Sequence, residues 1–470
     1  MIALSDMGKL NPWWGNAEWT TTDDPHLSAV DEAPFAWDPR PFDVSDIDSG
    51  AVFTLRGPRQ CGKTTLTKRL VADRVAAGLG RRTCYLTLRI VDDADEMRSA
   101  IEQVLRLWPA EDPASPWLFI LDELTFVKGW ANAIAHLREF DPTFRRATVI
   151  ITGSSSTDLV ASADDLHGRR GRHGRPLDRL HMPMTFREYV GFRDRSVRLG
   201  APIPLSDLLA DDGRQEVTGL ALHGAALDQY LGEYARCGGL PAPVADMLTD
   251  GGVSSGTIME LWRGLSADVR RLGRSEERLA KLVSRTVVAL GSLTNLADVS
   301  RDMDVTKPTA AEYVRLLAQS FAMIVLHQRD HKRQAGPSLT LPRKHYFGDP
   351  AFATIPAAQG GPEAGTASLV ENVLAMSLFR LVEQNALESF AVPQRLFLWR
   401  SGRGREIDFI AHTDSTTVPI ESKYASEPSG KDYESMSKAF GRGVMASRDT
   451  LVTDRPILTV PAGVLLASLG

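Results

Sequence analysis

Cysteine is scarce in this sequence. The 470 residues contain three cysteines, Cys61, Cys84 and Cys237, which lie far apart in the chain. This odd and dispersed set argues against a disulfide framework, and no two of the cysteines have the spacing of a metal-binding pair. Such scarcity is typical of the reducing cytosol, so we expect a cytoplasmic protein.

Long apolar runs are also missing. No uninterrupted apolar stretch reaches the ~18 residues that a membrane-spanning helix needs. The N-terminus, residues 1–6, has neither the basic flank nor the apolar core of a secretory signal. We therefore expect no membrane partner. The apolar tail, residues 456–469, is short and broken by Pro461, which predicts a last strand and a short helix of a globular domain.

The chain lacks an excess of positive charge. Its formal net charge is −5, with 43% apolar and 24% charged residues, which is the balance of a soluble globular protein. Any contact with nucleic acid must therefore use local basic patches. A length of 470 residues exceeds what one hydrophobic core supports and predicts about three domains.

The glycine-rich stretch 57–64 is the most informative pattern that is present. It reads G-x-x-x-x-G-K-T and stands between an apolar run at 51–55 and a helical pattern at 65–71. A strand, a glycine-rich turn and a helix are the context in which this pattern holds nucleotide phosphates on backbone N–H groups. Lys63 is expected to reach the β- and γ-phosphates of ATP, and Thr64 is expected to bind Mg²⁺. The predicted nucleotide-binding residues are Gly57, Pro58, Arg59, Gln60, Cys61, Gly62, Lys63, Thr64 and Thr65.

An acidic pair follows roughly 60 residues after this loop, as nucleotide hydrolysis requires. The apolar run 117–121 delivers Asp122 and Glu123 at the C-terminal end of a predicted buried strand. Asp122 is expected to hold Mg²⁺, mostly through water. Glu123 is expected to polarise the attacking water, a role that favours hydrolysis over phosphoryl transfer to another substrate.

A third predicted strand, residues 147–152, ends in hydroxyl side chains. Ligand contacts in parallel α/β sheets lie just beyond the carboxyl ends of strands. Thr152, Ser154 or Ser155 is therefore placed to sense the γ-phosphate. The alternative, equally favoured for each of them, is that the hydroxyl residue only forms part of a turn. We assign Ser154 to the nucleotide site.

A cationic loop, residues 167–175, comes next. Its glycines predict mobility and its arginines a strong positive charge. Arg169 or Arg172 is placed to act on the γ-phosphate, either in its own subunit or in a neighbouring one. Action on a neighbouring subunit would require a homo-oligomer. A patch for nucleic-acid phosphates and a plain solvated loop are the alternatives.

The segments described above together resemble those of the bacterial and archaeal AAA-type ATPases that carry a C-terminal domain long described as of unknown function. The resemblance runs from about residue 45 to the end, and it includes the phrases at 182–189 and 237–241. It implies an α/β P-loop domain that binds and hydrolyses ATP, with ATP and Mg²⁺ as cofactors.

The middle of the chain, residues 276–328, has helical periodicity. Thr306 is a predicted helix cap. Two short helices around a turn, followed by the apolar strand 322–326, suggest a winged helix-turn-helix, a unit that enters the DNA major groove. The candidate recognition helix has only Lys307 and Arg315 as cations, so a protein-packing module is the open alternative.

Two predicted strands near the C-terminus carry charged residues within apolar runs. The first spans residues 405–411 and the second residues 418–424. Because side chains alternate along a strand, Glu421 and Lys423 share a face, and Asp408 of the neighbouring strand lies beside them. The apolar flanks predict that these charges are partly buried.

Glu371, on the helix before these strands, is the fourth member of the set. The arrangement of Asp408, Glu421 and Lys423 looks like the PD-(D/E)XK site of restriction-endonuclease-like proteins. That resemblance implies that Asp408 and Glu421 hold Mg²⁺ and that Lys423 positions or activates water for phosphodiester cleavage. A fold kept for binding nucleic acid or protein after loss of catalysis is the alternative.

The expected fold class is α/β: a P-loop AAA-type ATPase domain, a helical and winged-helix middle, and an α/β restriction-endonuclease-like domain. The predicted segments are an extension (1–44), the ATPase core (45–190), a helical connector (191–275), the winged helix (276–340) and the nuclease-like domain (341–470). The tryptophan-rich extension either wraps the core or contacts adenine.

The predicted function is ATP hydrolysis coupled to action on nucleic acid, with DNA preferred, and a Mg²⁺-dependent nuclease site. Two alternatives stay open. One is a DNA- or protein-binding regulator with an inactive nuclease-like domain, and the other is a protein-directed remodelling ATPase.

Overall fold

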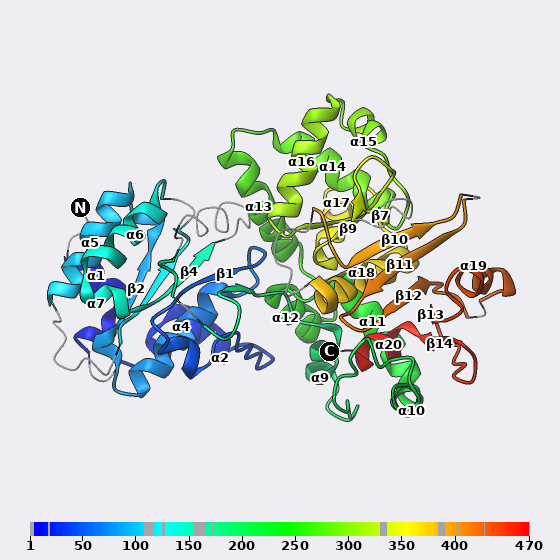
Figure 1. Cartoon of the computed structure of the whole chain (residues 1–470), viewed down its shortest axis with the longest axis horizontal. Helices are drawn as coiled ribbons and strands as arrows, with labels where there is room; N and C mark the ends of the chain where they lie inside the picture. Colours follow the sequence, from blue (N-terminus) through cyan, green and yellow to red (C-terminus); the bar gives the residue numbers. More distant parts are fainter. Residues whose placement is uncertain are drawn as a thin grey trace. The chain divides into compact units, whose positions relative to one another are not determined.

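The chain divides into two compact units, Met1–Met182 and Pro183–Gly470 (Figure 1). The structure is a computed structural model, and it describes residues 4–16, 19–107, 116–124, 127–153, 166, 168–171, 173–329, 336–383, 391–402, 404–426 and 428–469. The division falls inside the segment expected to form the ATPase core. The finer boundaries at 190, 275 and 340 lie within the second unit and stay a prediction.

The first unit is built on a five-stranded, fully parallel sheet with the order β2-β3-β4-β1-β5. Its strands are β1 Val52–Arg56, β2 Thr83–Thr87, β3 Leu118–Asp122, β4 Thr148–Gly153 and β5 Asp178–Leu180. β1 and β3 are buried along their whole length, and both flank β4. Because parallel strands end at the same edge, the loops that follow β1, β3 and β4 meet there.

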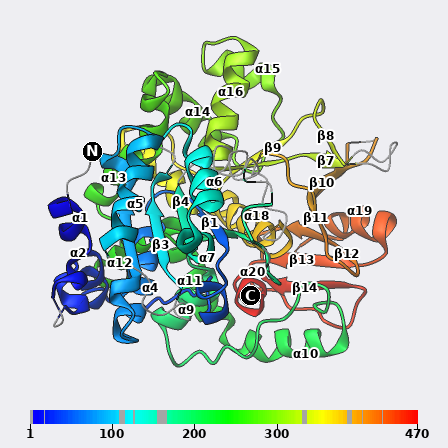
Figure 2. The same cartoon turned by 60° about the vertical axis from the view of Figure 1, so that its left-hand side comes forward.

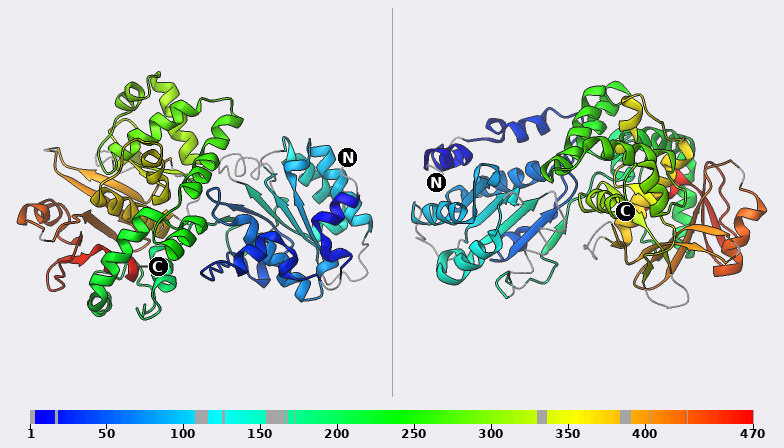
Figure 3. Two further views of the ribbon diagram at one scale, coloured as in Figure 1. Left: turned by 180° about the vertical axis from the view of Figure 1, so that it is seen from behind. Right: turned by 90° about the horizontal axis from the view of Figure 1, so that it is seen from above.

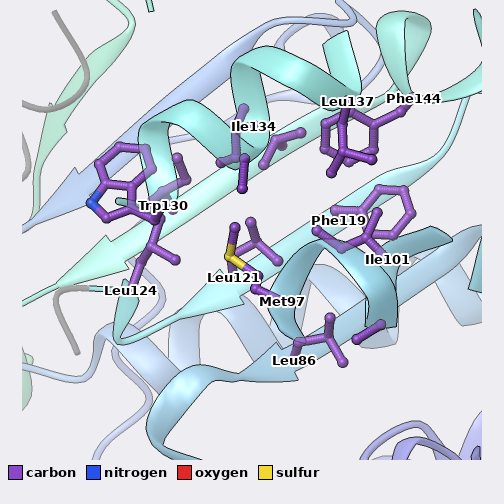
Figure 4. Close-up of a cluster of buried hydrophobic side chains, with 14 of the residues drawn as sticks. Leu86, Met97, Ile101, Phe119, Leu121, Leu124, Trp130, Ile134, Leu137 and Phe144 are labelled. Carbon is purple, nitrogen blue, oxygen red and sulfur yellow. The ribbon is translucent and has the colours of Figure 1, made fainter. Parts of the chain in front are cut away.

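Alternating side chains divide the apolar residues of this sheet between two faces. Phe119 and Leu121 of β3 belong to a core with α5 and α6, whereas Leu118 and Ile120 belong to a core with α4 (Figure 4). The helices of the unit are α1 Leu4–Leu10, α2 Pro25–Asp31, α3 Val44–Ile47, α4 Lys63–Ala76, α5 Ala94–Leu107, α6 Trp130–Phe140 and α7 Pro142–Arg146. This three-layer packing is the expected α/β arrangement.

The N-terminal extension packs against the sheet. The side chain of Asn11 accepts from the backbone N–H of Tyr85 at 2.7 Å and donates to its carbonyl at 3.0 Å, so it occupies the open edge of β2. The indoles of Trp13 and Trp14 donate to the carbonyl of Thr83 at 3.1 and 2.9 Å. Of the two roles expected for this segment, wrapping the core is the one these contacts support.

The second unit contains a mixed seven-stranded sheet with the order β14-β13-β12-β11-β10-β7-β8. Its strands are β7 Gln328–Arg329, β8 Pro337–Ser338, β10 Leu396–Arg400, β11 Glu406–His412, β12 Thr417–Ser422, β13 Gly443–Ser447 and β14 Ile457–Pro461. Figure 2 shows the orange hairpin β11–β12 beside the strands β13 and β14. The hairpin and the final strand and helix were both expected from the sequence. Helices α18 Thr366–Glu383, α19 Gly430–Phe440 and α20 Ala462–Ser468 pack on the sheet.

Helices dominate the rest of the second unit, drawn mostly in green (Figure 3). They are α9 Phe186–Arg193, α10 Asp211–Leu220, α11 Gly224–Cys237, α12 Pro241–Asp250, α13 Ser255–Arg271, α14 Glu276–Val288, α15 Leu296–Asp302, α16 Lys307–Gln319 and α17 Ile355–Ala358. Thr306 caps α16, as expected. β6 Met323–Leu326 follows α16 and pairs with β9 Lys344–Phe347, which lies beyond the predicted boundary at 340.

A buried carboxylate, that of Asp349, packs against the glycine-containing segment 237–241. Asp349 accepts from the N–H groups of Gly239 and Ala351, each at 2.9 Å. Gly238 has a φ of 64°, and a Cβ atom there would lie 1.8 Å from Oδ1 of Asp349. The glycine phrase at 237–241 is therefore required for close packing.

The three cysteines, Cys61, Cys84 and Cys237, are free and buried. Among the helices in the described part of the chain, none has the length and apolar content to cross a membrane.

Candidate functional site

The glycine-rich loop turns sharply between β1 and α4. Gln60 and Gly62 have φ values of 61° and 93°, and Gly62 is the residue before the first turn of α4. A non-glycine residue in the left-handed region is uncommon and concentrates at functional sites. Left-handed residues within such a loop turn successive backbone N–H groups toward one side, which forms an anion-binding concavity.

His181, which directly follows β5, holds this loop in place. Its Nε2 atom lies 2.7 Å from the carbonyl of Cys61, and its backbone N–H donates to the carbonyl of Arg56 at 2.7 Å. Because a carbonyl only accepts, Nε2 carries the proton. Gly57 also packs closely against His181, because a Cβ atom at position 57 would lie 2.0 Å from the carbonyl oxygen of His181. The imidazole ring of His181 also stacks on Trp37 of the extension, with the two ring centres 5.2 Å apart.

Lys63 begins α4 and folds back over its own loop. Its ammonium donates to the carbonyls of Gly57 at 2.9 Å and Pro58 at 2.7 Å. The charge is thus already held above the loop in which phosphates would bind. Reaching a phosphate requires Nζ to leave these two carbonyls.

Asp122, at the end of β3, accepts from three hydroxyl groups. Thr64 donates to Oδ2 at 3.0 Å, Tyr85 donates to Oδ2 at 2.6 Å, and Thr152 donates to Oδ1. Burial raises the pKa of Tyr85, and the charge of Asp122 adds to the effect, so the phenol keeps the proton that it donates. The pairing of Thr64 with Asp122 was expected from the sequence, but the role of Tyr85 was missed.

Glu123 is the next residue, and its backbone is also left-handed, with a φ of 59°. Its N–H donates to the hydroxyl of Thr152 at 3.0 Å, and its carboxylate forms a two-pronged ion pair with Arg89, which follows β2. Thr152, one of three hydroxyl residues considered for sensing the γ-phosphate, therefore links both acidic residues. In this arrangement the Glu123 carboxylate is held by a cation.

The residues at this edge fit Mg²⁺ together with a nucleotide. A hydroxyl oxygen and a carboxylate oxygen 3.0 Å apart, beside a phosphate-binding loop, are the protein ligands that Mg²⁺ takes when phosphates and water complete its shell.

The cationic loop forms ion pairs within the first unit. Arg169 contacts Glu139 at 2.6 Å, and Arg170 contacts Asp178 at 2.9 Å. The pair at Arg169 is exposed on both sides, so it is weak. Arg172, Ser154 and Ser155 lie outside the described residues.

The four residues predicted in the C-terminal domain come together. The backbone N–H of Asp408 donates to Glu421 at 3.1 Å, and the N–H of Ser422 donates back to Asp408 at 2.9 Å. Lys423 contacts the other oxygen of Glu421 at 3.1 Å. Glu371 and Asp408 both contact a cation that was not predicted from the sequence.

That cation is Lys344 of β9, whose side chain is 2% exposed. Its Nζ atom lies 2.7 Å from oxygens of Glu406 and Asp408 and 3.1 Å from Glu371. Tyr346, two residues along β9, donates to Glu371 at 2.6 Å. Lys344 and Tyr346 alternate along β9, so their side chains share one face of this buried strand, and that spacing was the available signal.

The electrostatics of this cluster follow from its burial. Burial lowers the pKa of Lys344, but the facing carboxylates outweigh that effect and leave the pKa above its ordinary value. Burial and the charge of Asp408 both raise the pKa of Glu371 and of Glu421. The cluster therefore keeps Lys344 charged and disfavours full ionisation of its carboxyl groups.

Divalent metal ions do not fit the C-terminal cluster as it stands. Asp408 and Glu421 each already contact an ammonium group, Lys344 at 2.7 Å and Lys423 at 3.1 Å, and these positive charges repel a divalent ion. Among the residues that the structure describes, no group of three or more His, Cys, Asp or Glu side chains is arranged to hold a metal ion.

Comparison with known proteins identifies three regions. The model of the AAA domain family matches residues 49–190. Two further models, each described as a domain of unknown function, match residues 228–360 (DUF8612) and 367–454 (DUF4143). A search of curated proteins found no match.

Several solved structures align with much of the chain at low similarity. The Walker-type ATPase PABY2304 of Pyrococcus abyssi is 15% identical, with 65% of this chain and 90% of that chain covered and a TM-score of 0.34. The Aeropyrum pernix ORC1 protein, solved in complex with DNA, is 14% identical, with 69% and 86% covered and a TM-score of 0.28. A variant of Thermotoga maritima RuvB is 12% identical, with 60% and 85% covered and a TM-score of 0.28. The family match at 49–190, the parallel sheet and the loop at 57–64 show that this part of the chain is a P-loop AAA-type ATPase domain.

Proposed function

We propose that this chain is an ATP-hydrolysing AAA-type protein that acts on nucleic acid. The observation that carries the ATPase proposal is the meeting of Lys63, Thr64, Asp122 and Glu123 at one edge of the parallel sheet. These residues supply the cation, the metal ligands and the base that nucleotide hydrolysis requires.

Each residue has a separate task in this proposal. Lys63 moves from its two loop carbonyls to the β- and γ-phosphates. Mg²⁺ bound by Thr64 and Asp122 would polarise the phosphate oxygens when present. Glu123, released from Arg89, orients the attacking water and accepts its proton. The ion pair with Arg89 therefore holds the base in a restrained state before hydrolysis.

Steady-state hydrolysis and nucleotide binding test the ATPase. We expect Lys63→Ala to lose both, and Glu123→Gln to retain binding while turnover falls by roughly 10²–10⁴-fold, the contribution of a general base. Lys9→Ala removes an exposed lysine of the same unit and is the control. Full turnover in Glu123→Gln would contradict the assignment.

Action on nucleic acid is supported by the helix pair α15–α16. Lys307 and Arg315 are exposed on α16, the second helix of the pair, and the β6–β9 strands follow as a wing would. Binding of duplex DNA that weakens steeply with salt, and that Lys307→Ala with Arg315→Ala reduces, would support a winged-helix role. Hydrolysis that is indifferent to DNA and RNA, without salt-sensitive binding, would instead favour the protein-directed remodelling ATPase.

Assembly through an arginine finger is a separate part of the proposal. Arg169 and Arg172 are the candidates, and the exposed pair of Arg169 with Glu139 lets that arginine exchange partners at little cost. Turnover that rises with protein concentration, and falls in Arg169→Ala or Arg172→Ala, would support a homo-oligomer. Unchanged turnover in both variants would refute the finger.

For the C-terminal domain, one observation favours the regulator over the nuclease. The carboxylates of Asp408 and Glu421 are already paired with the ammonium groups of Lys344 and Lys423, so the domain is proposed to bind without cutting. Assays with Mg²⁺ or Mn²⁺ on DNA and RNA, with and without ATP, decide between the two. Metal-dependent cleavage that is lost in Lys423→Ala would restore the nuclease interpretation.

A further inference from the structure

A buried ammonium group stands at the centre of the C-terminal carboxylates. Lys344 is 2% exposed and its Nζ atom lies within 3.1 Å of three carboxylates, which come from α18 and β11. An ammonium has three N–H bonds and no acceptor, so three carboxylates complete its partners. A buried lysine keeps its charge only when such partners offset the loss of hydration.

The distances in this cluster suit an ammonium. Contacts of 2.7, 2.7 and 3.1 Å join Nζ to the oxygens of Glu406, Asp408 and Glu371. Mg²⁺ binds oxygen at about 2.0–2.1 Å, so each oxygen would have to move inward by at least about 0.6 Å. Two further oxygens are engaged, because Asp408 also accepts from the N–H of Ser422 and Glu421 accepts from that of Asp408.

The backbone fixes Lys344 in this position. β9 pairs with β6, with Lys344 opposite Leu326. The side chain of Asn372, next to Glu371 on α18, accepts from the N–H of Phe347 at 2.7 Å and donates to its carbonyl at 3.2 Å. The strand that carries the ammonium and the helix that carries Glu371 are therefore joined, which holds the backbone of Lys344 beside the carboxylates.

We propose that Lys344 is a tethered cation that takes the place of a divalent metal ion in this cluster, so that the native domain binds no metal there and becomes a metal site only when Lys344 is removed. The inference builds on the proposed non-cutting role and explains it. It assigns the cluster to a latent site for an oxygen-loving divalent ion such as Mn²⁺ or Mg²⁺.

Mn²⁺ binding to the full-length protein, followed by electron paramagnetic resonance without nucleotide or nucleic acid, tests the proposal separately from ATP hydrolysis and from cleavage. We expect the wild type to bind no Mn²⁺ tightly, and Lys344→Ala to gain a site that Asp408→Asn abolishes. Removal of the ammonium should also lower the melting temperature, and Mn²⁺ should restore part of it. Lys344→Met, which keeps the side-chain volume, is the second variant.

A matched control is available in the first unit. Lys68 is another buried lysine, but the ion pair that the described residues give it is with the single carboxylate of Asp24, at 3.1 Å. Lys68→Ala should therefore gain no Mn²⁺ site. Two results would overturn the proposal: Mn²⁺ binding by the wild type that Asp408→Asn abolishes, or a folded Lys344→Ala that binds no Mn²⁺. Should neither Lys344 variant fold, the wild-type titration alone decides.

Discussion

Removal of the Tyr85 hydroxyl is the sharpest test of the nucleotide site. The phenol donates to Oδ2 of Asp122 at 2.6 Å, and both residues are 4% exposed. Tyr85→Phe keeps the ring, and with it the contact to the Lys68 ammonium, which lies 4.0 Å from the ring centre. The substitution therefore removes one hydrogen bond and little else.

The size of the effect follows from the partners that remain. A hydrogen bond to a charged group contributes roughly 1.5–3 kcal/mol. Asp122 keeps two other donors, Thr64 and Thr152, so we expect the lower end of that range, about 1.5 kcal/mol. That corresponds to about a tenfold change in an equilibrium constant, which agrees with the 10–100-fold typical of groups that orient a metal ligand.

Titration with Mg²⁺ measures this change. We expect Tyr85→Phe to raise the Mg²⁺ concentration that half-saturates binding of a fluorescent ATP analogue by about tenfold, with nucleotide binding in the absence of Mg²⁺ unchanged. Tyr230→Phe is the control, because Tyr230 also donates to an aspartate, Asp194 at 2.8 Å, but in the second unit. The reasoning is wrong if the Mg²⁺ dependence does not move, or if binding without Mg²⁺ weakens as much.

Three further predictions concern other contacts. Arg89→Ala frees the carboxylate of Glu123, so basal ATP hydrolysis should rise several-fold. The free energy of unfolding should fall by less than about 1 kcal/mol, because Arg89 is 59% exposed. A fall in hydrolysis would contradict the proposal that Arg89 restrains Glu123. His181→Ala removes the hydrogen bond to the carbonyl of Cys61 and should weaken nucleotide binding by about fivefold, or ~1 kcal/mol. Unchanged affinity would show that the loop at 57–64 keeps its conformation without His181. Burial raises the pKa of Asp349 to about 7, so its contribution to stability is full below pH ~4 and is lost as pH rises through 7. Melting curves should therefore show a shallower loss of stability between about pH 4 and 7 in Asp349→Asn than in the wild type, and equal slopes would refute this.

Features encoded in continuous stretches of sequence were predictable. The loop at 57–64, the strand that ends in Asp122, and the hairpin of β11 and β12 each combine a local pattern with a local turn. In such stretches the spacing of residues determines which side chains share a face, without knowledge of the sheet order. The convergence of Asp408 with Glu421 follows from that hairpin alone.

Features that depend on the order of strands were missed. Tyr85 and Arg89 lie on or after β2, and they reach Asp122 and Glu123 because β2 is the neighbour of β3. His181 reaches the loop because β5 is the neighbour of β1. Sequence spacing carries no information on these neighbours, since the strands are joined by helices of varied length.

The donors around the two carboxylate sites differ in charge, and this difference decides which site accepts a metal ion. Asp122 is held by neutral hydroxyl groups, which leave its negative charge available to a cation. Asp408 is held by the ammonium of Lys344 at 2.7 Å. A divalent ion placed about 3–4 Å from that fixed charge would meet a repulsion on the order of 10 kcal/mol at an effective dielectric constant of about 20. We infer that the carboxylate of Asp122 is open to Mg²⁺ in one domain, whereas the carboxylate of Asp408 is closed to it in the other.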